Sequence, residues 1–103
     1  MQMHDAHRVE IIIEAVMERR LCERLIEAGV TGFTVLPVHA GSGRSGHWER
    51  EGQVSKAGGM VAVICLLRPD RVDSLLEAVF PLLERHIGVV SVCEAKVIRS
   101  ERF

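Results

Sequence analysis

Residues 58–98 read GGMVAVICLLRPDRVDSLLEAVFPLLERHIGVVSVCEAKVI, and they decide the fold because they contain a whole strand–helix–strand unit. The apolar run at 58–67 predicts a buried strand. Pro69 then opens a helix, because proline is tolerated in a first helical turn. The apolar stripe of that helix consists of Val72, Leu75, Leu76, Val79, Leu82 and Leu83. Gly88 ends the helix, and residues 89–98 predict the second strand of the unit.

A second unit of similar size precedes the first. Residues 8–16 predict a strand and residues 1–7 are expected to fray. Residues 16–28 predict a helix and residues 31–40 another strand. The apolar side of that helix is expected to carry Val16, Leu21, Leu25 and Ile26. Two such units in tandem indicate an α+β, ferredoxin-like βαββαβ sandwich, in one domain spanning residues 1–103, with four antiparallel strands and both helices on one face.

The other face of the predicted sheet has no element of this chain left to cover it. Residues 61–67 and 89–97 are apolar at positions that point to both faces of a strand. A chain of 103 residues buries only roughly 60–65% of its unfolded surface, so its own core is modest. The sequence therefore predicts that the sheet packs against other subunits.

Composition excludes several classes of protein. Lys and Arg number 13 and Asp and Glu number 14, a net charge of −1 without the basic excess of a nucleic-acid-binding domain. No apolar run approaches the roughly 18–20 residues of a membrane span, and no secretory leader is visible, so a cytoplasmic location without membrane insertion is expected. Cys22, Cys65 and Cys93 form no CxxC pair, so we expect buried thiols rather than disulfides or a zinc site.

Residues 41–57, GSGRSGHWEREGQVSKA, interrupt the apolar pattern and predict a long flexible loop. Its glycines let backbone N–H groups face an anion, and Arg44 adds a guanidinium that suits a phosphate or a carboxylate. A solvated hairpin loop without a ligand is the alternative. The glycine spacing matches neither a Walker A loop nor a dinucleotide-binding fingerprint. An exposed Trp48 would indicate a contact surface.

Three short segments resemble the PII signalling superfamily. Residues 29–35, GVTGFTV, resemble its second strand, residues 41–47 the base of its T-loop, and residues 97–100 its basic C-terminal segment. The chain departs from the signalling type because the Gly-Asp-Gly-Lys B-loop is missing and no Tyr is available for uridylylation. Residues 88–97 and 39–44 instead resemble the PII-like subgroup tied to inorganic carbon, which comprises the SbtB type and the carboxysome-associated type (CPII).

That resemblance implies a homotrimer with an adenine nucleotide in each cleft between subunits: ADP or AMP, with ATP and cyclic AMP as alternatives. The residues implied for the nucleotide are Thr34 at the base, Gly41, Ser42, Gly43 and Arg44 at the phosphates, Gly88, Val89 and Val90 beside the cleft, and Arg99 and Arg102 across the interface. Bicarbonate is implied as a second ligand of Ser42, Gly43 and Arg44.

The resemblance also implies a sensor without catalysis or metal. Ligands would change the T-loop, which would present Trp48, Glu49 and Arg50 to a partner, with a membrane bicarbonate transporter as the expected one. A small enzyme or a metal-binding trimer similar to CutA proteins stays open as the alternative, with His39, His47 and Cys93 as candidate ligands.

Overall fold

The computed structural model describes residues 1–43, 46–49 and 59–98, and the side chains of residues 43 and 46–49 are not part of that description. The elements follow one another as β1 (His4–Glu14), the 3-10 turn η1 (Ala15–Met17), α1 (Glu18–Glu27), β2 (Thr34–Val38), β3 (Ala40–Gly43), β4 (Gly46–Glu49), β5 (Met60–Leu67), the 3-10 turn η3 (Pro69–Arg71), α2 (Val72–Glu84) and β6 (Gly88–Val97).

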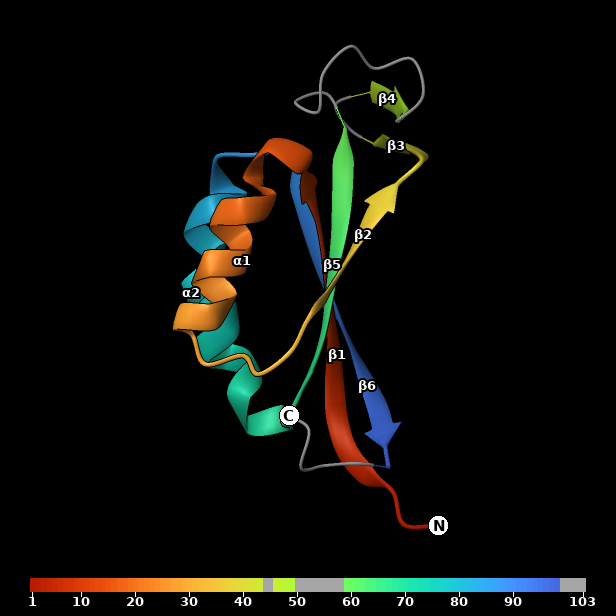
Figure 1. The fold of residues 1–103 in the computed structure, drawn as a ribbon, viewed down its shortest axis with the longest axis vertical. Coiled ribbons are helices and arrows are strands. Elements are labelled where there is room, and N and C mark those ends of the chain that lie inside the picture. Colours follow the sequence, from red (N-terminus) through yellow and green to blue (C-terminus); the bar gives the residue numbers. More distant parts are fainter. Residues whose placement is uncertain (44–45, 50–58, 99–103) are drawn as a thin grey trace.

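Four of the strands form one antiparallel sheet in the order β2-β5-β1-β6. Both helices lie against the same face of this sheet, and the β3–β4 hairpin stands at one end of it (Figure 1). The central strand β1 pairs Ile11 with Val63 of β5 on one side and with Val90 of β6 on the other. The predicted ferredoxin-like arrangement is therefore confirmed.

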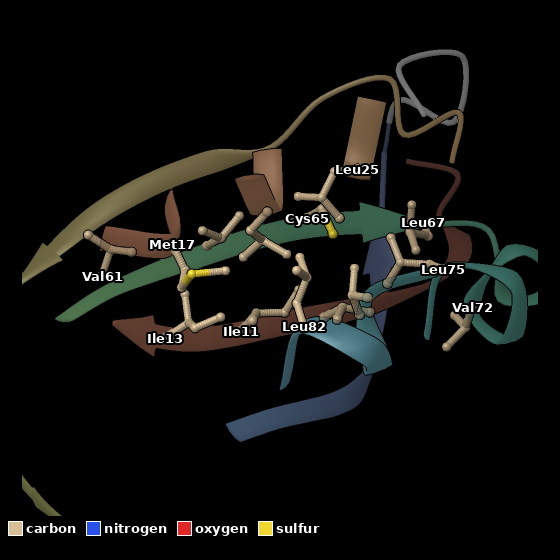
Figure 2. Packing of buried hydrophobic residues seen from close by; sticks show 14 residues of the cluster. Ile11, Ile13, Met17, Leu25, Val61, Cys65, Leu67, Val72, Leu75 and Leu82 are labelled. Carbon is tan, nitrogen blue, oxygen red and sulfur yellow. The ribbon is translucent and has the colours of Figure 1, made fainter. Parts of the chain in front are cut away.

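The core lies between the sheet and the helices. Side chains on a strand alternate between its faces, so Val9, Ile11 and Ile13 of β1 all point at the helices, and each is 0% exposed. They meet Leu21 and Leu25 from α1, which are equally covered. Figure 2 shows this cluster with Met17, Cys65, Leu75 and Leu82 around it. Burial of this layer supplies most of the driving force for the fold.

The predicted apolar side of the first helix is only half right. Leu21 and Leu25 are buried, whereas Val16 is 60% and Ile26 is 63% exposed, and Met17 is buried instead. Steps of four residues lead from Leu25 to Leu21 and on to Met17, so these three share one side of the helix. At about 100° per residue, Ile26 is rotated about 100° from Leu25, and Val16 about 140° from Leu21, so both point away from the sheet.

Two further boundaries differ from the prediction. Residues 4–7 are strand rather than frayed coil, because they pair with residues 94–97 of β6. The start of the predicted flexible loop is also regular: β3 and β4 form a hairpin in which Gly41 pairs with Trp48 and Ser42 with His47. The rest of that loop, residues 44–45 and 50–57, lies outside the described part of the chain.

The face of the sheet away from the helices is apolar along part of its length. One row of paired residues runs from edge to edge and consists of Leu36, Ala62, Ile12 and Val89. Leu36 is 45% and Val89 is 58% exposed, at the two ends of this row. We call this the open face. No element among the described residues covers it.

The cysteines differ in burial, which corrects the expectation that all three are buried thiols. Cys65 points into the core and is 2% exposed, Cys22 is half-buried, and Cys93 is exposed. Cys93 pairs with Arg8 across β1 and β6, and alternation places both on the open face. Burial raises the pKa of the Cys65 thiol to about 11.

Candidate functional site

The base of the predicted T-loop is built by β2 and β3. Thr34 opens β2, is exposed, and lies on the open face in a row with Ile64, Glu10 and Ser91. Soon after β2 ends, the chain enters the β3–β4 hairpin, where Gly41 is half-buried and Ser42 exposed. Pairing with β4 holds Gly41, Ser42 and Gly43 in an extended conformation.

Several predicted residues of the loop cannot be placed. Arg44 and Arg50 lie outside the described residues. Trp48 and Glu49 belong to β4, but their side chains are not described, so their role as a partner-contact surface stays a prediction.

A short connection joins α2 to β6 where the sequence predicts that the B-loop is missing. Only Arg85, His86 and Ile87 separate the end of α2 from Gly88, the first residue of β6. Gly88 is pressed against β1: a Cβ atom there would lie 2.9 Å from the backbone oxygen of Ile12. Val89, the next residue, is exposed on the open face.

Sequence reasoning missed the side chain that holds this connection. The carboxylate of Glu14, the last residue of β1, accepts a hydrogen bond from the backbone N–H of Ile87 at 2.9 Å. The same oxygen lies 3.5 Å from Nδ1 of His86. No local pattern reveals this contact, because it joins residues 73 positions apart.

One chain does not bring the two halves of the predicted nucleotide site together. Pro37, Val61, Ile13 and Gly88 form one row across the sheet, so β2 and β6 are its two edges. Three strand spacings separate those edges, roughly 14 Å. The T-loop base therefore belongs to one edge of the sheet and Gly88–Val90 to the other.

The predicted tail residues are also separated from the T-loop base. From Gly88 the strand β6 runs to Val97 at the far end of the sheet, a path of roughly 30 Å at about 3.3 Å per residue. Arg99 and Arg102 follow that far end and lie outside the described residues. Val97 pairs with His4, whereas the T-loop base adjoins the row at the opposite end of β1. The T-loop base therefore lies at the opposite end of the sheet from Val97.

A separate hollow of about 590 Å³ lies at that far end, lined by Asp5, Ala6, His7, Pro69, Glu94, Ala95 and Lys96. Lys96 donates a hydrogen bond to Asp5, which lowers the pKa of the Asp5 carboxyl and raises that of the Lys96 ammonium. The hollow contains none of the predicted site residues. It went unpredicted because it depends on the pairing of residues 4–7 with residues 94–97.

The residues that would serve a metal are not assembled in the described part of the chain. His39 follows β2 at one sheet edge and Cys93 lies in β6 at the other, while the side chain of His47 is not described. No group of three or more His, Cys, Asp or Glu side chains among the described residues could hold a metal ion. Among the same residues, no helix has the length and apolar character needed to span a membrane.

Known proteins resemble the chain along almost its whole length. A structure of CPII, a nitrogen regulatory PII-like protein from Thiomonas intermedia K12 bound to ADP, AMP and bicarbonate, is 28% identical with a TM-score of 0.91, over 99% of this chain and 96% of that one. A PII-like signalling protein from Thermus thermophilus is 20% identical with a TM-score of 0.85, over 100% of this chain and 99% of the other.

The GlnK–ATP complex of B. subtilis shares the fold at 20% identity and a TM-score of 0.64, over 88% of this chain and 82% of that one. None of the curated protein sequences matches the chain. The family model of the nitrogen regulatory protein P-II matches residues 6–102. The chain therefore belongs to the nitrogen regulatory protein P-II family.

Proposed function

We propose that this protein is a non-catalytic cytoplasmic sensor that forms a homotrimer and binds an adenine nucleotide, ADP or AMP, together with bicarbonate in the clefts between subunits. The observation that carries the proposal is that the predicted site residues of β2–β3 and of β6 lie at opposite edges of the sheet, combined with exposed apolar side chains on the open face. The CPII structure with ADP, AMP and bicarbonate supports the choice of ligands, because it is similar over almost the whole chain.

Assembly follows from the open face. An apolar row that crosses four strands and ends in the exposed side chains of Leu36 and Val89 costs free energy in water, and packing against another copy removes that cost. A closed ring of three copies would set the β2 edge of each chain beside the β6 edge of the next. Each cleft would then receive a T-loop base from one chain and Gly88–Val90 from its neighbour.

The chemistry of the cleft fits an anionic ligand. Gly41, Ser42 and Gly43 offer backbone N–H groups and a hydroxyl without bulky side chains, and Arg44 follows them directly in the sequence. A guanidinium can bind a phosphate oxygen and a neighbouring bicarbonate oxygen at once. Thr34, which is exposed on the open face, would contact the base, and Arg99 and Arg102 of the adjoining subunit would add charge at the phosphates.

The assembly is tested by mass. Light scattering behind a sizing column should give about three times the 11.5 kDa of one chain. Leu36→Lys should yield smaller species, because it places an ammonium in the apolar row. Ile26→Lys is the matched control, since Ile26 is 63% exposed on α1, on the other side of the molecule. A monomeric wild-type protein, or equal effects of the two variants, would contradict the proposed interface.

The ligands are tested by calorimetry. Titrations of AMP, ADP, ATP and cyclic AMP, each with and without bicarbonate, should show nucleotide binding that bicarbonate tightens, and by reciprocity nucleotide should tighten bicarbonate equally. Arg44→Ala should weaken binding about tenfold or more, the value of a hydrogen bond to a charged group. Arg19→Ala is the control, because Arg19 is exposed on α1 and pairs only with Glu23 among the described residues. No nucleotide binding at millimolar concentration would refute the proposal.

The readout of the sensor is proposed to be the T-loop, which would engage or release a bicarbonate transporter through Trp48, Glu49 and Arg50. Binding of the wild-type protein to the detergent-solubilised transporter should change when bicarbonate is added to the nucleotide-bound form. Replacing Trp48 with Ala should weaken that binding while nucleotide affinity stays unchanged. Binding that responds to neither change would separate the T-loop from the partner.

A further inference from the structure

A side-chain hydrogen bond, and not a backbone pair of the sheet, holds the connection from α2 into β6. Backbone pairing between β1 and β6 ends at Ile13 with Gly88, so the N–H of Ile87 has no partner in the ladder. The next residue of β1, Glu14, uses its backbone to pair with Met60 of β5 and turns its carboxylate toward β6. That carboxylate accepts a hydrogen bond from the Ile87 N–H at 2.9 Å. The contact between β1 and β6 thereby continues one residue beyond the backbone pairing.

A second group supports this contact. Nδ1 of His86 lies 3.5 Å from the same carboxylate oxygen, and the side chains of His86 and Glu14 are 30% and 24% exposed. Partial burial strengthens a hydrogen bond to a carboxylate, because fewer water molecules compete for the oxygen. Beyond Ile87 the chain has little freedom, since Gly88 already lies against the Ile12 oxygen. The Glu14 contact therefore decides how the chain enters the segment Gly88–Val90.

We propose that Glu14 is a positioning residue for the ligand cleft: its carboxylate fixes the backbone at Ile87 and thereby the placement of Gly88–Val90. The inference rests on the proposed function for the ligand, but the hydrogen bond itself does not. This chain has no Gly-Asp-Gly-Lys B-loop, and Gly88–Val90 would contribute to a cleft through the position of their backbone. The hydrogen-bond acceptor on Glu14 fixes the backbone in that position.

Two substitutions separate the hydrogen bond from the charge. Glu14→Ala removes both, whereas Glu14→Gln keeps an acceptor oxygen and removes only the charge. Glu84→Ala is the matched control, because Glu84 is exposed at the end of α2, beside the same connection, and makes no ion pair or hydrogen bond within the described residues. The amide exchange of Ile87 is measured by NMR without ligand, and AMP affinity is measured by calorimetry.

Glu14→Ala should speed exchange of the Ile87 amide about tenfold or more and weaken AMP binding about three- to tenfold, the value of one lost hydrogen bond. Glu14→Gln should recover most of both losses, and Glu84→Ala should match the wild-type protein. Equal losses in Glu14→Gln and Glu14→Ala would show that charge rather than position matters and would overturn the proposal. Unchanged exchange in Glu14→Ala would also overturn it.

Measuring both amide exchange and AMP affinity also distinguishes failure of this inference from failure of the proposed function. Wild-type protein that binds neither AMP nor ADP refutes the proposed ligand and the ligand role of Glu14 together, whatever the exchange rates are. Wild-type protein that binds AMP, with Glu14→Ala binding equally well despite faster exchange at Ile87, refutes the positioning role alone.

Discussion

Gly88→Ala should destabilise the protein far more than Gly32→Ala, although both glycines stand in segments that resemble family motifs. An alanine Cβ at position 88 would lie 2.9 Å from the Ile12 backbone oxygen, 3.1 Å from Cδ2 of Leu83 and 3.4 Å from Cγ1 of Ile13. Leu83 can adjust its side chain, but the Ile12 oxygen belongs to the central strand, which is paired on both sides. Relief of the contact must therefore move backbone.

Overpacking of this kind costs about 1–3 kcal/mol, and loss of the unfolded-state freedom of glycine returns about 0.4–1 kcal/mol. A net loss of about 1–2 kcal/mol corresponds to a fall in the melting temperature of roughly 5–15 °C for a domain of this size. At Gly32 no atom lies within 4 Å of the added Cβ and φ is not positive, so Gly32→Ala should leave stability unchanged or slightly higher.

Thermal unfolding followed by circular dichroism measures the difference, at one protomer concentration because the proposed assembly would contribute to stability. A Gly88→Ala protein that melts within about 2 °C of the wild type would refute the close approach of β6 to β1 at this point. Equal losses in the two variants would refute it as well, because they would trace the effect to glycine itself and not to its surroundings.

Other parts of the fold give further expectations. Leu25→Ala should cost about 2–5 kcal/mol in urea unfolding, because Leu25 is 0% exposed, whereas the adjacent Ile26→Ala, 63% exposed, should change stability by less than about 0.5 kcal/mol. Cys65, with a pKa of about 11, should resist iodoacetamide at pH 8 in the native protein and react once unfolded, as read by intact mass. The Asp5 carboxyl has its pKa lowered from 3.8 by its hydrogen bond from Lys96, so its stabilising effect is present above that value and is lost as pH falls through the lower folded pKa. Asp5→Asn should therefore be slightly less stable than the wild type at pH 7, by an amount that salt reduces, and the difference should vanish in strong acid.

Local pattern predicted the elements that bury a continuous apolar surface. Within the run at 60–67 all residues except Ile64 and Leu66 are buried, and the stripe of α2 is buried at Val72, Leu75, Val79 and Leu82. These elements owe their form to residues close together in the chain, which is the information that periodicity carries. The order of the elements then restricted the topology to the sandwich that the structure has.

Contacts between distant residues account for the errors. Residues 4–7 are polar and read as a frayed end, but they form a strand because Ala6 meets Ala95 and Asp5 meets Lys96 across β6. Cys93 reads as a buried thiol among apolar neighbours, yet it faces the open side of an edge strand. For residues 4–7 the pairing partners lie about 90 residues away in the chain. For Cys93 the alternation of side chains along the strand decides which face it occupies. Local composition contains neither fact.

The arrangement of the candidate site also depends on contacts between distant residues, which local sequence does not contain. The motifs at 29–35 and 88–97 pointed to residues that the fold places on opposite edges of one sheet, with the open face between them. In the proposed assembly each chain carries two different half-sites, and a site is complete only beside another copy. Ligand that binds at such a junction must stabilise the assembly, and assembly must raise affinity for the ligand, since both belong to one thermodynamic cycle. Charge introduced at Leu36 is therefore expected to weaken nucleotide binding without touching the nucleotide, and nucleotide is expected to restore the assembly at concentrations where the free protein dissociates.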